Sequence, residues 1–315
     1  AQPIRTRGDR VSALLSDATA EYLDSRRARG IKKATVINEK VVLGQFLAAN
    51  GNLLVKNLTS VHVDRYFTSR PGLAASTWNR NTAYLRGFFK WCRARKYVPK
   101  DFDPLEGVGM RKVVPREFIF LPVDRFTELL DNAKNPRDRA VCALGLYSFQ
   151  RASELNRLTW DDIDDTHTDP KQWRIAVYRQ KTEDRDWLPL CQELRDELHR
   201  WRVTYGTSVG EPPRGHWYVV PAFKPGNWKQ DANRRLALAS PLELNPTRRY
   251  GQPQKAVQHA LTVLGYATTK HEGAHTLRRS GGYALYQELA WERGHDGALR
   301  IVQSMYGHAS LATTE

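Results

Sequence analysis

The chain has 315 residues, which is long enough for two domains that each bury a core. Hydrophobic residues make up 41% and charged residues 26%, a composition that excludes a disordered or fibrous protein. The net charge is +15: residues 1–100 carry 19 basic and 6 acidic side chains (net +13), and residues 101–315 carry 30 and 28 (net +2). Such a cationic module is typical of a nucleic-acid-binding protein, and a merely soluble basic surface is the alternative.

Several other protein classes are excluded by short-range features. The longest apolar run, residues 141–149, is far too short to cross a bilayer, and we recognise no signal segment. The three cysteines are widely spaced and include no Cys-x-x-Cys pair, which argues against a disulfide framework and a structural zinc site. We therefore expect a cytoplasmic protein without a membrane partner.

Residues 10–95 are predicted to form four helices. The second, over residues 35–49, ends at an Asn-Gly turn signal; the third starts near Ser60, and the fourth begins at a cap provided by Ser76. The fourth helix carries an aromatic stripe that is typical of a buried face. Basic side chains project elsewhere from the same helix, and we expect them to bind DNA phosphates: Arg80, Arg86, Lys90 and Arg93.

A linker and a second domain are predicted to follow. Helical periodicity fails from residue 100, where Pro and Gly recur, so we divide the chain into a basic domain (1–99), a linker (100–117) and a second domain (118–315). A mostly apolar helix over 137–149 precedes an alternating strand over 173–178 and a return strand over 187–190. Further helices are expected over 191–204, 254–264, 276–289 and 298–306. The fold class is therefore mainly α with a small antiparallel β-sheet.

The second domain holds five candidate catalytic side chains next to apolar segments. Arg151 directly follows the apolar helix, Lys181 lies at the tip of the predicted hairpin, and His308 follows a glycine after the last helix. His275 and Arg278 are one helical turn apart and can face one point. Taken singly, each has a structural alternative: a helix cap, a solvated lysine, or a histidine satisfied within the fold.

The order of these motifs resembles the tyrosine recombinase (phage integrase) family over nearly the whole chain. The motifs are Arg-x-x-Glu-Leu, Leu-Thr-Trp-Asp-Asp-Ile-Asp, a hairpin Lys-Thr before Leu-Pro-Leu, His-x-x-Arg, and Gly-His-Ala-Ser-Leu-Ala-Thr-Thr. The segment from Ser76 to Asp103-Pro104 resembles the family's core-type DNA-binding domain. The resemblance implies a four-helix, SAM-like core-binding domain followed by an α+β catalytic domain.

The resemblance also implies a role for each candidate. Arg151 and Arg278 would grip the non-bridging oxygens of the scissile DNA phosphate, because guanidinium forks match the geometry of a phosphate. Lys181 would be the general acid for the leaving 5′ oxygen. His275 would assist proton transfer from the nucleophile, His308 would hydrogen-bond the phosphate, and Glu154 would orient Arg151. The reaction needs no cofactor.

The acidic run 161–165 offers a competing metal site. Clustered carboxylates could hold Mg²⁺ for a two-metal nuclease. However, a contiguous run on a turn points its side chains in divergent directions, and the family carries a similar segment without using it for metal. We therefore favour a solvated turn and predict no metal ligands.

The family's nucleophilic tyrosine lies about nine residues beyond the histidine that matches His308. That position falls two residues past Glu315, so we expect the chain as given to be unable to form the covalent intermediate. Tyr306, Tyr283 and Tyr286 do not match the motif. The resemblance implies a phage-type site-specific recombinase that forms a 3′-phosphotyrosine link to double-stranded DNA and assembles as a homotetramer. The alternatives are an inert DNA-binding regulator and a type IB topoisomerase.

Overall fold

The structure is a computed structural model that describes residues 12–115, 117–179, 184–225, 228–230, 236–238, 242–266 and 272–307. It divides into two compact units, Ala1–Arg116 and Glu117–Glu315, each described by itself below. The first unit therefore includes most of the segment that we expected to be a linker. None of the helices among these residues is long and apolar enough to span a membrane.

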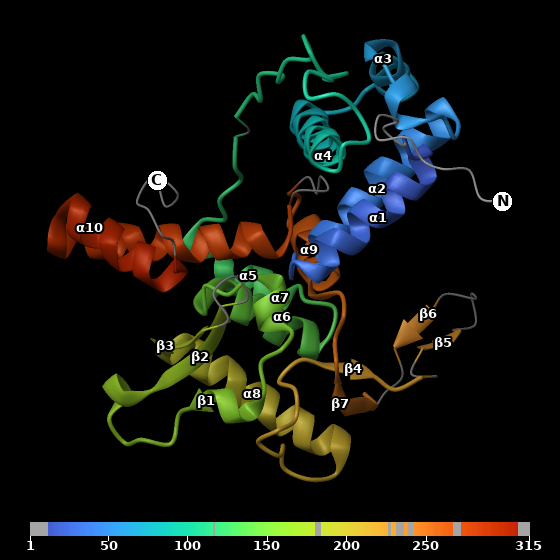
Figure 1. The fold of residues 1–315 in the computed structure, drawn as a ribbon. Coiled ribbons are helices and arrows are strands. Elements are labelled where there is room, and N and C mark those ends of the chain that lie inside the picture. The colour runs from blue at the N-terminus through green and yellow to red at the C-terminus, as the bar shows by residue number, and fades with distance from the viewer. Residues whose placement is uncertain are drawn as a thin grey trace. The chain divides into compact units, whose positions relative to one another are not determined.

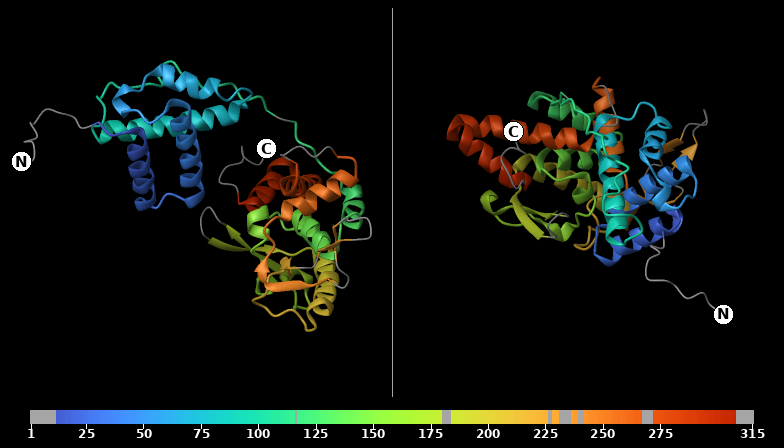
Figure 2. Two further views of the ribbon diagram at one scale, coloured as in Figure 1. Left: turned by 90° about the vertical axis from the view of Figure 1, so that its right-hand side faces the viewer. Right: turned by 45° about the horizontal axis from the view of Figure 1, so that its top comes forward.

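Within residues 12–115, the first unit contains the four expected α-helices. They are α1 (Leu15–Ala28), α2 (Lys33–Asn50), α3 (Ser60–Thr68) and α4 (Ala75–Ala94), with a short 3₁₀ turn at Val55–Asn57. In Figures 1 and 2, α1 and α2 lie side by side. The helix α4 begins earlier than expected: Ser76 lies in its first turn, and Ala74 is the N-cap residue.

The aromatic stripe of α4 forms the core of this unit, as the spacing predicts. Phe88 and Phe89 are fully buried, and the ring of Phe88 meets the edge of Tyr22 from α1 at 5.6 Å between centroids. From α2, Phe46 packs edge-on against Phe89 at 6.0 Å. Burial of these large rings is the main driving force that holds the four helices together.

The segment after α4 packs back along that helix. The Asn79 side chain forms two hydrogen bonds with the backbone of Arg111. Its Nδ2 donates to the Arg111 carbonyl at 2.9 Å, and its Oδ1 accepts from the Arg111 N–H at 2.8 Å. The Arg111 guanidinium lies 3.5 Å from the centroid of the Trp78 ring, and Leu105 is buried in the core. Glycine and proline break the helical pattern here without preventing the segment from packing.

The second unit combines helices with short antiparallel strands. Its α-helices are α5 (Phe126–Asp131), α6 (Pro136–Tyr147), α7 (Ala152–Leu155), α8 (Gln192–Val209), α9 (Pro253–Val263) and α10 (Ala274–Tyr306). A three-stranded sheet has the order β1 (Ile163–Asp164), β2 (Arg174–Arg179), β3 (Asp184–Pro189). Two further pairs are β4 (Pro221–Phe223) with β7 (Leu244–Arg249), and β5 (Trp228–Gln230) with β6 (Leu236–Leu238). The expected fold class is confirmed.

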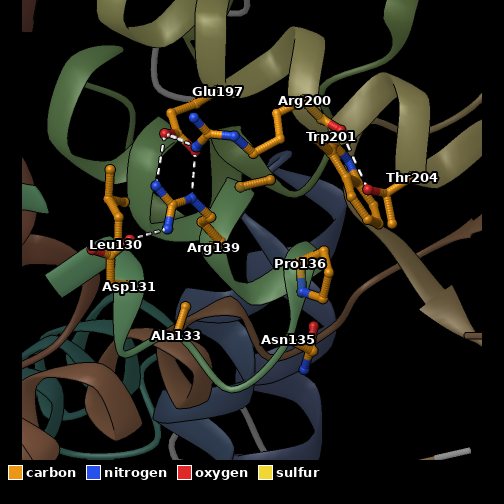
Figure 3. A pocket seen from close by; sticks show the side chains of 11 residues that line it. Leu130, Asp131, Ala133, Asn135, Pro136, Arg139, Glu197, Arg200, Trp201 and Thr204 are labelled. Carbon is orange, nitrogen blue, oxygen red and sulfur yellow. Dashed lines mark hydrogen bonds and ion pairs between the residues drawn. The ribbon is translucent and has the colours of Figure 1, made fainter. Parts of the chain in front are cut away.

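The buried helix α6 is the centre of this unit (Figure 1). The residues at its start strongly favour a helix N-terminus. Asn135 caps the helix by accepting a hydrogen bond from the Asp138 N–H, and Pro136 occupies the first turn. Arg139 ties α6 to two neighbouring helices: Nε lies 2.7 Å from Glu197 of α8, and Nη1 lies 2.6 Å from Asp131 of α5. These side chains, drawn in Figure 3, line a hollow of about 250 Å³.

A glycine lets α10 approach α6 closely. A Cβ at Gly281 would overlap the carbonyl oxygen of Leu146, so only glycine permits this contact. Two helices were expected over 276–289 and 298–306; the structure joins them in α10, which is interrupted by the non-helical backbone of Gly294. The close crossing brings Arg278 to the end of α6.

Candidate active site

The site begins where α6 ends. Phe149 adopts a positive φ of 54°, a left-handed conformation that costs a non-glycine residue about 1–2 kcal/mol. This sharp turn separates α6 from the short helix α7, whose N-cap residue is Arg151. The turn after the buried end of α6 thus places Arg151 at the edge of the core, where the Arg151 side chain is 39% exposed.

Glu154 links the two predicted phosphate-binding arginines. Its carboxylate accepts from the Arg151 backbone N–H at 2.8 Å and from Nη1 of the Arg151 side chain at 2.9 Å. The same carboxylate lies 3.8 Å from Nη1 of Arg278. Because the Glu154 side chain is only 1% exposed, its charge acts strongly on both guanidinium groups. Glu154 therefore contacts Arg151 and faces Arg278, and its role in orienting Arg151 stays a prediction.

Arg278 is almost completely buried, with 2% of its surface exposed. Its guanidinium donates to the carbonyl of Phe149 and, at 2.9 Å, to the carbonyl of Tyr306. A long, flexible side chain is thereby held in one orientation by backbone groups from two distant segments.

His275 belongs to the same cluster. Removal of water by the surrounding protein and the positive charges of Arg278, Arg279 and Arg151 lower the pKa of His275 below its usual value. The imidazole is therefore neutral at pH 7, the form that can accept a proton. The structure thus brings together Arg151, Glu154, His275 and Arg278 from two segments more than 120 residues apart.

Two predicted members, Lys181 and His308, lie outside the described residues. Tyr306 lies next to the cluster but is 7% exposed, and its hydroxyl donates to the backbone carbonyl of Arg278 at 2.7 Å. Burial raises the pKa of Tyr306 to about 12, which disfavours the phenolate. These contacts support the interpretation of Tyr306 as a packing residue rather than a nucleophile.

Comparison with known proteins identifies the family. The model described as "Phage integrase family" matches residues 120–315 of the chain. The chain belongs to the phage integrase family.

Relatives of this family match along most of their length. Tyrosine recombinase XerC of Mycobacterium tuberculosis is 26% identical over 314 residues, which cover 95% of this chain and 91% of the relative. XerC of Ralstonia pickettii is 29% identical over 285 residues and covers 87% and 78%.

Solved structures of family members share the fold. A lambda integrase dimer bound to a COC' core site matches with a TM-score of 0.67 and 16% identity, covering 96% of this chain and 77% of that one. The XerH recombinase in a post-cleavage complex with a palindromic difH substrate matches with a TM-score of 0.61 and 17% identity, covering 94% and 79%.

The four basic residues of α4 differ in their contacts. Arg80, Arg86 and Lys90 are exposed, and Arg80 lines a hollow of about 70 Å³ between α2 and α4 together with Arg70. Arg86 and Arg93 donate to the carbonyls of Val108 and Phe102 and so hold the following segment against α4. The role of all four residues as DNA contacts stays a prediction.

The acidic run 161–165 has its carboxylates paired with different arginines. Asp162 pairs with Arg185 at 2.6 Å, Asp164 pairs with Arg174 at 2.9 Å, and Asp165 pairs with Arg202 at 3.2 Å. The side chains diverge as expected, but the prediction of a solvated turn is wrong: residues 160–162 form a 3₁₀ helix, residues 163–164 form β1, and Asp165 is buried. In the described part of the chain, no three His, Cys, Asp or Glu side chains gather in a way that could hold a metal ion.

Sequence reasoning missed two contributors to the site. The left-handed Phe149 carries no local signal, because the residues around it read as the end of an apolar helix. Arg279 follows Arg278 and lies 3.4 Å from Glu272, with its guanidinium 4.3 Å from the centroid of the Phe118 ring. A second arginine directly after the His-x-x-Arg motif was the available signal.

Proposed function

We propose that this chain is a site-specific DNA recombinase that cuts and rejoins DNA strands through a 3′-phosphotyrosine intermediate. The observation that carries this proposal is the gathering of Arg151 and Arg278 about the buried carboxylate of Glu154, with His275 near enough to both arginines for their charges to lower its pKa. Two guanidinium groups side by side match the charge that develops on the non-bridging oxygens of a phosphate under attack.

The proposed reaction conserves the phosphodiester bond energy. A tyrosine hydroxyl attacks the phosphorus, the P–O5′ bond breaks, and the 3′ end becomes linked to the protein. Neutral His275 assists transfer of the tyrosine proton, and Lys181 gives a proton to the departing 5′ oxygen. Attack of a 5′ hydroxyl from the partner duplex reverses these steps, which restores the tyrosine and joins the new strand.

Membership in the phage integrase family supports three further features of this function. We propose that four protomers join two duplexes, that the reaction takes place in the cytoplasm, and that the nucleophile is a tyrosine two residues beyond Glu315. Relatives named as DNA-bound complexes, including a lambda integrase tetramer bound to a Holliday junction, support double-stranded DNA as the partner.

A nicked DNA substrate tests this function. If the nick lies just 3′ of the scissile phosphate, the short 5′-hydroxyl fragment diffuses away and traps the covalent link. We expect the full-length protein to give a protein–DNA adduct in a denaturing gel, and the variant with phenylalanine at the proposed nucleophile to give none. DNA binding without any adduct would indicate an inert regulator. In a separate assay on a supercoiled plasmid, relaxation of supercoils without strand exchange would indicate a topoisomerase.

A further inference from the structure

Tyr306 contacts Arg278 with three separate groups. The tyrosine hydroxyl donates to the Arg278 carbonyl at 2.7 Å, and the tyrosine carbonyl accepts from Nη2 of Arg278 at 2.9 Å. In addition, the guanidinium carbon of Arg278 lies 4.5 Å from the centroid of the tyrosine ring, within the range of a cation–π contact. One residue thus holds both the main chain and the side chain of Arg278.

The surroundings of Tyr306 are shaped to fit it. The edge of the Phe149 ring meets the tyrosine ring at 5.9 Å between centroids, and the Phe149 carbonyl accepts from the other terminal nitrogen of Arg278. A Cβ at Gly282 would overlap the tyrosine hydroxyl. Only glycine at position 282 leaves room for the Tyr306 ring.

This arrangement connects distant parts of the chain. Tyr306 is the last residue of α10, whereas Arg278 is in its second turn, 28 residues earlier. The Phe149 contact adds the end of α6 to the same cluster. Since burial raises the pKa of Tyr306 to about 12, its hydroxyl keeps its proton and remains a hydrogen-bond donor throughout the physiological pH range.

We infer that Tyr306 is a positioning residue that fixes the Arg278 guanidinium in the orientation required to bind the scissile phosphate. This inference rests on the proposed function. A guanidinium that is held in place before the reaction stabilises the developing charge without reorganising, whereas one free to rotate loses part of that effect. Tyr306 thereby contributes to the rate of cleavage without touching DNA.

The variant Tyr306→Phe tests the inference, because it removes the hydroxyl while keeping the ring and the backbone carbonyl. We expect single-turnover strand cleavage to slow on the order of tenfold, because the lost hydrogen bond holds the main chain of Arg278, from which the guanidinium extends toward the phosphate. The dissociation constant for the DNA site should stay unchanged, since Arg278 contacts one phosphate among many.

Tyr205→Phe is the matched control. Tyr205 is fully buried in the same unit, and its hydroxyl also donates to a backbone carbonyl, that of Tyr218 at 3.0 Å. Both variants should lower the melting temperature by roughly 2–4 °C. Only Tyr306→Phe should slow cleavage. Equal slowing by both variants, or cleavage by Tyr306→Phe at the wild-type rate, would overturn the inference.

A double-mutant cycle with Arg278→Lys shows whether Tyr306 acts through the guanidinium. In the Arg278→Lys background, we expect Tyr306→Phe to change the cleavage rate less than twofold, because the group that it positions is gone. Slowing of the same size in both backgrounds would contradict the inference. If Arg278→Lys itself cleaves like the wild type, the proposed function of Arg278 fails instead, so the two failures are distinguishable.

Discussion

Glu154 allows Arg278 to be buried. Its side chain is 1% exposed and that of Arg278 is 3% exposed, with 3.8 Å between them, and the same carboxylate also bonds Arg151 at 2.9 Å. Removing one partner of a buried ion pair leaves an uncompensated charge, which is strongly destabilising.

We therefore expect Glu154→Gln to lower the free energy of unfolding by about 3–5 kcal/mol. The amide keeps the shape of the side chain but removes the negative charge between two guanidinium groups. Urea denaturation monitored by circular dichroism measures the change. Glu211→Gln is a suitable control, since this carboxylate forms a single exposed pair with Arg214 and its loss should change stability by less than about 1 kcal/mol. Similar values for the two variants would show that Glu154 does not compensate buried charge.

His275 should give the cleavage rate a characteristic pH dependence. A base acts in its neutral form, so the rate rises as the pH passes through the pKa of His275 and is flat above it. Because the surrounding protein and the nearby arginines lower this pKa, we expect the midpoint to lie below the ordinary value of about 6.5. Single-turnover rates between about pH 5 and pH 8 measure it.

Two variants check the assignment of that midpoint. Arg279→Gln removes one of the positive charges that lower the pKa, so the midpoint should move upward. His275→Gln should slow cleavage and remove this dependence. A midpoint that persists in His275→Gln would belong to another group.

At the scale of single residues, the sequence singled out candidate site residues but not the residues that hold them in place. Arg151, His275 and Arg278 are recognisable because each lies in a local motif beside a periodic segment. Phe149 and Tyr306 support Arg278 from 129 and 28 residues away, and no local pattern reports a partner at such a separation. Tyr306 could only be predicted as a packing residue at the end of a helix.

Among the elements, the crossing of α6 and α10 determines where Arg278 lies. We expect Gly281→Ala to lower the free energy of unfolding by about 1–3 kcal/mol, because the new methyl group overlaps the Leu146 carbonyl and pushes the helices apart. Thermal unfolding measures the loss, and cleavage should slow along with it.

Gly44→Ala is the control for this substitution. Gly44 lies inside α2 with no atom within 4 Å of a Cβ built on it, so alanine should stabilise the helix by about 0.5–1 kcal/mol. Stabilisation by both variants would mean that the close approach at Gly281 does not limit the packing of α10.

Periodicity predicted the long elements and missed the short ones. The four helices of the first unit and the β2–β3 hairpin follow from apolar spacing, whereas β4 and β7 are 20 residues apart and too short to show an alternating pattern. The segment after α4 was expected to be a linker because it lacks periodicity. Its attachment through Asn79 and the Trp78–Arg111 stack depends on individual side chains rather than on a repeat.

For the whole molecule, we expect the uneven charge to make a large contribution to DNA binding. The surplus of +13 in residues 1–100 should displace counterions from the duplex. We expect the logarithm of the binding constant to fall linearly with the logarithm of salt concentration, with a slope of about −0.9 for each phosphate contacted. Fluorescence anisotropy between about 50 and 200 mM salt measures this slope.

The double variant Arg80→Ala/Lys90→Ala should make the slope shallower by about 2. An unchanged slope would exclude these two residues as phosphate contacts.

The most direct test of the central claim replaces the scissile phosphate with a neutral methylphosphonate. If Arg278 acts by neutralising a non-bridging oxygen, Arg278→Ala should slow single-turnover cleavage of the ordinary phosphate by about 10²–10³-fold but slow cleavage of the methylphosphonate only slightly. An equally large loss on both substrates would contradict the claim, since Arg278 would then serve the fold rather than the phosphate.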